Sequence, residues 1–204
     1  MTENFNSLTI DNTFNSQKSK SITLRSSTAS ERIRQLEKLQ DWIKSHLEDI
    51  RKGIFADFKK PYPEIDASEI YVVTSEIKHA IKNLDSWMKP KKVATPLPML
   101  GSNSHIQYEP KGTALIIAPW NYPFNLAIGP LVSALAAGCT AIIKPSELTP
   151  HTSALIRRMI EEIYEPDLVA VFEGEVEVAQ YLLSTCHLFF QTLLHHQYRH
   201  RRKV

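Results

Sequence analysis

The sequence predicts an α/β fold in which an amino-terminal helical pair is followed by a doubly wound parallel sheet. Apolar residues recur at helical spacing as far as residue 88, and beyond residue 103 short apolar runs alternate with helical segments. Strands that alternate with helices at these lengths are joined by right-handed crossovers, which gives a parallel sheet covered on both faces. The chain has 204 residues, 43% hydrophobic and 23% charged, a composition typical of a globular protein with a sizeable core.

The first part of the chain divides into an arm and two helices. Residues 1–26 are rich in Ser, Thr and Asn with little periodicity, and we expect an irregular arm. Residues 27–88 predict a helical hairpin. Thr28 and Glu31 match a capping box at the start of a long amphipathic helix that runs to residue 58.

The second helix of this hairpin is expected over residues 70–87, closed by Pro90. Residues 89–103 are rich in Pro and basic residues, and they predict a linker between the hairpin and the sheet.

Residues 104–183 predict a partial nucleotide-binding α/β domain. The expected strands are 105–108, 114–118, 140–143 and 168–172, and the expected helices are 124–137, 152–164 and 176–183. Ligands of such sheets bind at the carboxyl ends of the strands, so the segments that begin at Pro119 and at Lys144 are the places to search for function.

One long uncharged stretch, between Lys111 and Lys144, raises the alternative of a transmembrane helix. Pro119, Pro123 and Pro130 lie within it and would leave several backbone groups unsatisfied in lipid. We therefore expect a buried strand, helix and strand, and no membrane partner.

Charge and cysteine content suggest a reducing, cytoplasmic setting. The formal net charge is +2, much of it from the last few residues, which gives no reason to expect nucleic acid as a partner. There are two cysteines and no basic-then-apolar leader at the start, so no disulfide framework is implied.

Two places after the expected strands could carry chemistry. Asn121 lies between a Trp and a Tyr-Pro pair, where its carboxamide is free to donate, although a simple turn residue explains it as well. Lys144 and Glu147 are three residues apart at a strand end, where an ammonium and a carboxylate could hold the vicinal hydroxyls of a ribose. The alternative is that Lys144 is solvated and Glu147 merely starts a helix.

Several familiar signatures are absent. The sequence has no Gly-x-Gly-x-x-Gly fingerprint and no P-loop, and no metal site is expected because the clustered histidines near the end lack cysteine or carboxylate partners at ligand spacing. Cys139 lies between apolar elements and is expected to be a small buried hydrophobe.

Two motifs in order, residues 118–123 (APWNYP) and 144–150 (KPSELTP), resemble the aldehyde dehydrogenase superfamily. Residues 87–93 (WMKPKKV) and 95–97 (TPL) look like its class 3 branch. The resemblance covers roughly residues 28–183, so the chain resembles the amino-terminal part of such an enzyme with an incomplete, Rossmann-like sheet.

The resemblance implies oxidation of an aldehyde to a carboxylate with NAD or NADP as acceptor, through a cysteine thiohemiacetal and thioester that a glutamate helps to hydrolyse. Asn121 matches the asparagine that stabilises the oxyanion. Lys144 and Glu147 match residues that hold the adenosine ribose. The backbone that lines the nucleotide is matched by Ala118, Pro119 and Trp120.

The family's Thr-Gly-Ser loop, Leu-Gly-Gly segment and Gln-x-Cys nucleophile are not found in this sequence. Residues 184–204 are expected to be an aberrant basic tail produced by a frameshift near Ser184, with a designed tail for nucleic acid or targeting as the alternative. Cys186 is expected to be incidental.

We therefore expect this chain alone to be inactive and aggregation-prone, where the intact family forms homodimers. A non-catalytic nucleotide-binding or partner-docking module is the alternative function.

Overall fold

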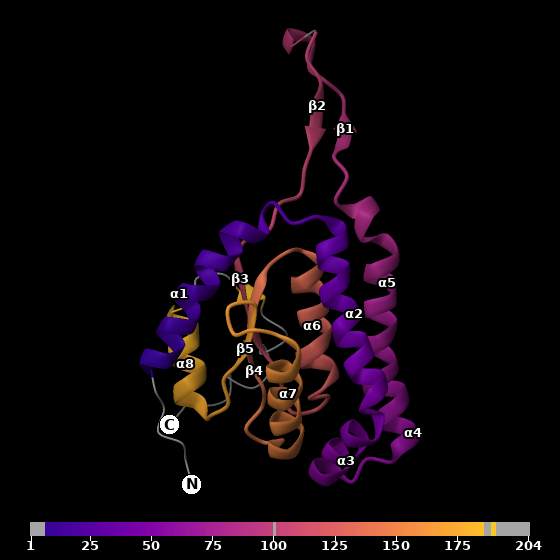
Figure 1. The fold of residues 1–204 in the computed structure, drawn as a ribbon, viewed down its shortest axis with the longest axis vertical. Coiled ribbons are helices and arrows are strands. Elements are labelled where there is room, and N and C mark those ends of the chain that lie inside the picture. Colours follow the sequence, from indigo (N-terminus) through magenta and orange to yellow (C-terminus); the bar gives the residue numbers. More distant parts are fainter. Residues whose placement is uncertain (1–6, 100, 186–188, 191–204) are drawn as a thin grey trace, which may run out of the picture.

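The structure is a computed structural model that describes residues 7–99, 101–185 and the backbone of 189–190. A four-stranded sheet lies at its centre, with helices on both faces and a narrow hairpin that projects from one end (Figure 1).

The central sheet is parallel throughout. Its spatial order is β5-β4-β3-β6, and Leu115 pairs with Ile142 in the register of the two middle strands. The α/β fold class is confirmed. The strands are β3 (Thr113–Ile117), β4 (Thr140–Lys144), β5 (Val169–Val171) and β6 (Phe189–Phe190).

Successive side chains of the middle strands enter two different cores, because side chains alternate between the faces of a strand. Ile116 and Ile143 belong to the large core, whereas Leu115 and Ile142 belong to a smaller one on the other face. The first face is covered by α6 (Asn125–Ala136) and α7 (Pro150–Ile163), and the second by α1 (Ser7–Leu24) and α8 (Val176–Thr185).

The expectation of an irregular amino-terminal arm is wrong, because residues 7–24 form the helix α1. Its sequence is polar and weakly patterned, so its order comes from tertiary contacts rather than from intrinsic propensity. Ile10 enters the smaller core, and Gln17 Nε2 donates to the carbonyl oxygens of Ala141 and Pro166, at 2.9 Å each.

The single long helix expected from residue 28 is two helices, α2 (Ala29–Ser45) and α3 (Leu47–Phe58). The capping box at the start of α2 is formed as expected, with Thr28 and Glu31 exchanging hydrogen bonds. The break falls at His46, whose backbone leaves helical geometry and whose ring stacks on Trp42 at 4.1 Å between centroids.

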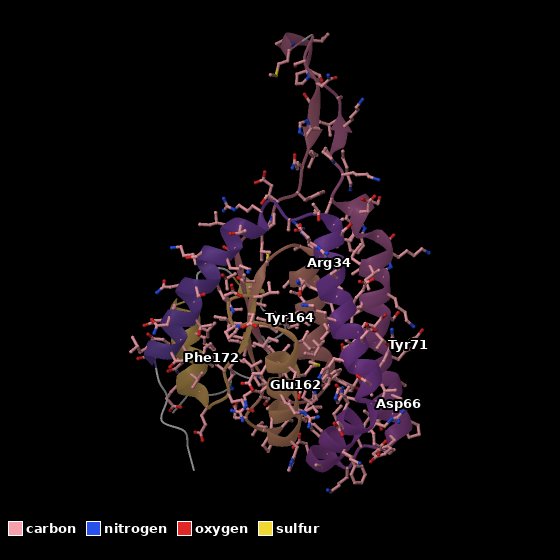
Figure 2. The ribbon with its side chains drawn as sticks, in the orientation of Figure 1. Arg34, Asp66, Tyr71, Glu162, Tyr164 and Phe172 are labelled. Carbon is pink, nitrogen blue, oxygen red and sulfur yellow. The ribbon has the colours of Figure 1, made fainter. Side chains whose placement is uncertain are left out.

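The second helix begins earlier than expected. A short α4 (Tyr62–Ile65) continues into a π-helical turn, η1 (Asp66–Ile70), and then into α5 (Tyr71–Trp87). Helix α5 packs against α2 and α6, and Tyr164 Oη donates to the Gln35 carbonyl oxygen (2.8 Å), which ties the end of α7 to α2 (Figure 2). The α2–α5 segment thus forms an outer helical layer over α6 and α7.

The expected linker over residues 89–103 is not simply a connection. Strands β1 (Lys91–Val93) and β2 (Ser104–Ile106) pair in antiparallel fashion around a short 3-10 turn, η2 (Leu97–Met99). Strand β2 pairs with β1 and not with the central sheet, so residues 104–106 lie in the projecting hairpin.

The structure describes only the first residues of the expected tail and the backbone of two later ones. Helix α8 continues to Thr185, and the backbone of Phe189–Phe190 joins the sheet beside β3. Cys186 and the rest of the expected basic tail lie outside the described residues. Within the described ranges, none of the helices is long and apolar enough to cross a membrane.

Candidate functional site

The two segments singled out from the sequence lie next to each other at the carboxyl edge of the sheet. One follows β3 (residues 118–124) and the other follows β4 (residues 144–150). The backbone N–H of Ala118 donates to the carbonyl oxygen of Lys144 at 3.0 Å, so the parallel pairing continues into the two segments. This edge is where ligands of doubly wound sheets bind.

The segment after β4 brings Lys144 and Glu147 together. Lys144 is only 3% exposed, and its Nζ donates to Glu147 Oε2. The alternative of a solvated lysine is wrong. The side chain of Glu147 is 38% exposed, so the pair consists of a buried ammonium and a carboxylate that is partly open to solvent.

The charge state of Glu147 follows from this arrangement. Partial burial opposes ionisation of its carboxyl, but the hydrogen bond from Lys144, with help from the backbone and from the charge of Lys144, outweighs burial and lowers the pKa of Glu147 below 4.5. At neutral pH the site therefore presents an ammonium that donates beside a carboxylate that accepts. Such a pair fits two neighbouring hydroxyl groups.

The turn that carries Glu147 is held by its own backbone and by the outer helical layer. Ser153 Oγ donates to the carbonyl oxygen of Ser146 at 2.8 Å. At the start of α7 the carboxylate of Asp57, from α3, accepts from the backbone N–H groups of His151 (3.1 Å) and Thr152 (2.8 Å).

The segment after β3 presents Asn121 to solvent between two half-exposed aromatic side chains. Trp120 stacks on Phe58, with 6.3 Å between ring centroids. The ammonium of Lys60 lies 4.5 Å from the centroid of the Tyr122 ring, at cation–π distance.

The same segment ends at a buried carboxylate. Glu69, from the π-helical turn, is fully buried, and its Oε2 accepts from the backbone N–H groups of Phe124 (3.2 Å) and Asn125 (3.0 Å) at the start of α6. Its Oε1 accepts from Lys60 Nζ at 2.9 Å.

Both helices that leave this edge thus begin at a carboxylate of the chain itself. Asp57 and Glu69 fill the positions where a phosphate binds in many nucleotide-binding folds. Sequence reasoning missed both residues. They lie 95 and 56 positions from the amides that they accept from, so no local pattern signals them.

Cys139 is buried, as expected, and it precedes β4, at the opposite edge of the sheet from Asn121. The residues that the structure describes contain no group of three or more His, Cys, Asp or Glu side chains suited to a metal ion.

The family profile described as "Aldehyde dehydrogenase family" matches residues 3–188. Two curated relatives illustrate the similarity. The 4,4'-diaponeurosporen-aldehyde dehydrogenase of Staphylococcus aureus is 45% identical over 170 residues, which is 83% of this chain and 36% of that protein. The aldehyde dehydrogenase family 3 member H1 of Arabidopsis thaliana is 38% identical over 153 residues, 75% of this chain and 32% of that protein.

Solved structures agree. The chain superposes on the substrate-bound state of Staphylococcus aureus AldH with a TM-score of 0.82 and 44% identity, covering 85% of this chain and 38% of that one. Proline utilization A (PutA) of Bdellovibrio bacteriovorus, at 22% identity and a TM-score of 0.77, shares the fold. This chain spans roughly two-fifths or less of the length of these proteins. By sequence profile and by fold alike, the chain belongs to the aldehyde dehydrogenase family.

Proposed function

We propose that this chain is the NAD(P)-binding part of an aldehyde dehydrogenase and that it holds the adenosine ribose through Lys144 and Glu147. The observation that carries the proposal is the pairing of a buried ammonium with a half-exposed carboxylate at the carboxyl end of β4. The ammonium donates to one ribose hydroxyl and the carboxylate accepts from its neighbour. The backbone of Ala118, Pro119 and Trp120, in the neighbouring segment at the same edge of the sheet, lines the nucleotide.

Asn121 is proposed as the donor to the oxyanion that forms when a nucleophile attacks the aldehyde carbonyl. Its exposed position after β3 leaves the carboxamide free to donate to a ligand at this edge of the sheet. When bound, NAD(P) supplies a hydride acceptor, and the whole protein then oxidises an aldehyde to a carboxylate. A donor of this kind contributes about 3–4 kcal/mol to the stabilisation of a transition state.

A second candidate function, a nucleotide-binding module without catalysis, is favoured by one observation. Among the described residues the one cysteine is Cys139, which is buried at the amino edge of the sheet, whereas Asn121 lies at the carboxyl edge. No described thiol is therefore placed to create an oxyanion for Asn121.

NADH titration of the 204-residue chain tests the binding proposal. We expect saturable binding, followed by NADH fluorescence, that falls at least tenfold in Lys144→Ala, since hydrogen bonds to charged groups are worth about 1.5–3 kcal/mol. Lys89→Ala is the matched control, because Lys89 also pairs with a nearby carboxylate, that of Asp85 four residues earlier, but lies on the surface. Absence of binding at millimolar NADH, or equal losses in both variants, would refute the ribose site.

An aldehyde-dependent assay separates the two functions. The 204-residue chain is expected to bind NAD without reducing it when an aliphatic or aromatic aldehyde is added. NADH production above that of a protein-free control would contradict the module without catalysis.

A further inference from the structure

The most unusual charged group outside the ribose site is Glu69. Its side chain is completely buried, and it accepts three hydrogen bonds: two from backbone N–H groups at the start of α6 and one from Lys60. A buried carboxylate is costly unless it is fully satisfied, and Glu69 is satisfied by a helix N-terminus and an ammonium together.

The backbone that carries Glu69 is itself fixed. Glu69 lies in the π-helical turn, where the wider turn changes the direction of the side chains relative to an α-helix. Arg51 from α3 donates two hydrogen bonds of 2.8 Å to the carboxylate of Asp66 in the same turn (Asp66 is labelled in Figure 2). The backbone turn from which the Glu69 side chain projects is therefore fixed to α3 by two hydrogen bonds.

Lys60 links Glu69 to the loop that carries Asn121. The side chain of Lys60 is 10% exposed, and its ammonium lies 2.9 Å from Glu69 Oε1 and 4.5 Å from the centroid of the Tyr122 ring. The same ammonium lies 5.6 Å from the Phe58 ring, which in turn stacks on Trp120. Of the two residues that flank Asn121, the Lys60 ammonium thus contacts Tyr122 directly and Trp120 indirectly, through Phe58.

We propose that Glu69, together with Lys60, is the positioning device for the Asn121 loop: it fixes the end of residues 118–124 at the start of α6 and fixes the Tyr122 ring beside Asn121. The importance of the loop rests on the function proposed above.

General stability alone does not account for such a pair. Replacing a buried ion pair by apolar side chains is often neutral or stabilising, so a buried pair is weak evidence for a stability role. The pair instead fixes directions. Glu69 accepts from two consecutive backbone amides, and the Lys60 ammonium lies over one face of the Tyr122 ring. A loop that must present a carboxamide in a fixed direction needs this kind of restraint.

Amide hydrogen exchange of the 204-residue chain, followed residue by residue by NMR, tests the proposal. In Glu69→Gln we expect exchange of the Phe124 and Asn125 amides to rise at least tenfold, with the amides of β4 unchanged. In Lys60→Met the carboxylate loses its cation but keeps the two amides, so we expect a smaller rise at these positions and a shift of the Tyr122 ring resonances. In the double variant Glu69→Gln with Lys60→Met the two amides still lack the carboxylate, so we expect their exchange to stay as fast as in Glu69→Gln.

Asp57→Asn is the matched control, because Asp57 holds the start of α7 in the same way. It should raise exchange at His151 and Thr152 and leave Phe124 and Asn125 unchanged. Unchanged exchange at Phe124 and Asn125 in Glu69→Gln overturns the proposal. A uniform rise over the whole chain overturns it too, because Glu69 would then act on global stability. If Glu69→Gln does not fold, Lys60→Met carries the test through the Tyr122 resonances.

The NADH affinity of the same variants tests whether the Asn121 loop affects the proposed nucleotide site. We expect Glu69→Gln to weaken NADH binding severalfold through the backbone of residues 118–120, with Lys144→Ala as the reference for direct loss. If the wild-type chain binds no NADH, the proposed function fails, whereas the exchange data still decide the role of Glu69.

Discussion

The two segments that meet at the carboxyl edge of the sheet have the same architecture but differ in whether their polar side chains are already paired. Each follows a middle strand, and each leads into a helix whose first amides are accepted by a carboxylate of the outer helical layer, Glu69 for α6 and Asp57 for α7. After β4 the side chains that we propose to bind the ribose are already paired, because Lys144 is buried against Glu147. After β3 the proposed oxyanion donor, Asn121, is exposed, and the aromatic side chains on either side of it make the contacts instead.

This difference matches the two tasks that we propose. A ribose has the same hydroxyls before and after reaction, so a preassembled donor and acceptor suit it. An oxyanion forms only during the reaction, so its donor must have no other hydrogen-bond partner beforehand. The surrounding loop then has to keep the donor in place. The outer helical layer supplies that rigidity in both segments, through side chains far away in the sequence.

The largest expected effect concerns the buried end of the β3 segment. Phe124 is fully buried at the start of α6. Phe124→Ala is expected to lower the free energy of unfolding by about 3–5 kcal/mol, since it removes a large core side chain and leaves a cavity. Urea denaturation followed by circular dichroism measures it. Leu148→Ala, in the β4 segment and 65% exposed, should change the same quantity by less than about 0.5 kcal/mol. Equal losses would show that the two segments do not differ in this way.

The next effect tests the cap of α7. Asp57→Ala removes the acceptor for two backbone N–H groups and for Thr152 Oγ1. Loss of a helix cap typically costs about 1–2 kcal/mol. We expect the unfolding midpoint in urea to fall accordingly while NADH affinity falls only modestly. A loss of affinity as large as that of Lys144→Ala would mean that Asp57 contacts the nucleotide.

A smaller effect concerns the pH dependence of the paired site. The lowered pKa of Glu147 means that its ionised form is favoured by folding, so its stabilisation is present above the ordinary value of 4.5 and is lost as the pH falls through the lower, folded value. The stability difference between wild type and Glu147→Gln should therefore stay constant from neutral pH to near 4.5 and shrink below it. Because the side chain is more than one-third exposed, this difference should not exceed about 1 kcal/mol. A difference that shrinks already between pH 7 and 6 would contradict the pairing.

The smallest effect on stability is expected at Asn121 itself. Asn121→Ala should change the free energy of unfolding by less than about 0.5 kcal/mol, because the side chain is exposed. The thermal midpoint, compared with wild type, measures it. A loss above about 1 kcal/mol would show that the carboxamide already serves the fold and is not waiting for a ligand.

Much of the sheet could be predicted from the sequence, because buried parallel strands such as residues 114–118 and 140–143 are continuous apolar runs between turn signals. The pairing of Lys144 with Glu147 could also be predicted, because two residues three positions apart at a strand end stay close whatever the rest of the chain does. The capping box of Thr28 and Glu31 is equally local.

Two features that escaped prediction, the helix α1 and the contacts of Glu69, depend on contacts between distant parts of the chain. The helix α1 lacks an apolar stripe, and its Gln17 reaches the carbonyl oxygen of Ala141, 124 positions away. The break at His46 shows no proline or glycine to announce it. In the sequence Glu69 is one more acidic residue on an expected helix, and only the packing of the π-helical turn η1 against α6 places it next to the Asn121 loop. Tertiary contacts override local pattern at these places.

The central claim is that Lys144 and Glu147 recognise the vicinal hydroxyls of a ribose, and competition with bound NADH tests it most directly. Adenosine and 2′,3′-dideoxyadenosine carry the same base and differ only in these hydroxyls. We predict that adenosine displaces NADH from the 204-residue chain and that the dideoxy analogue does so at least tenfold more weakly, with the discrimination lost in Lys144→Ala. Equal displacement by the two nucleosides would contradict the account.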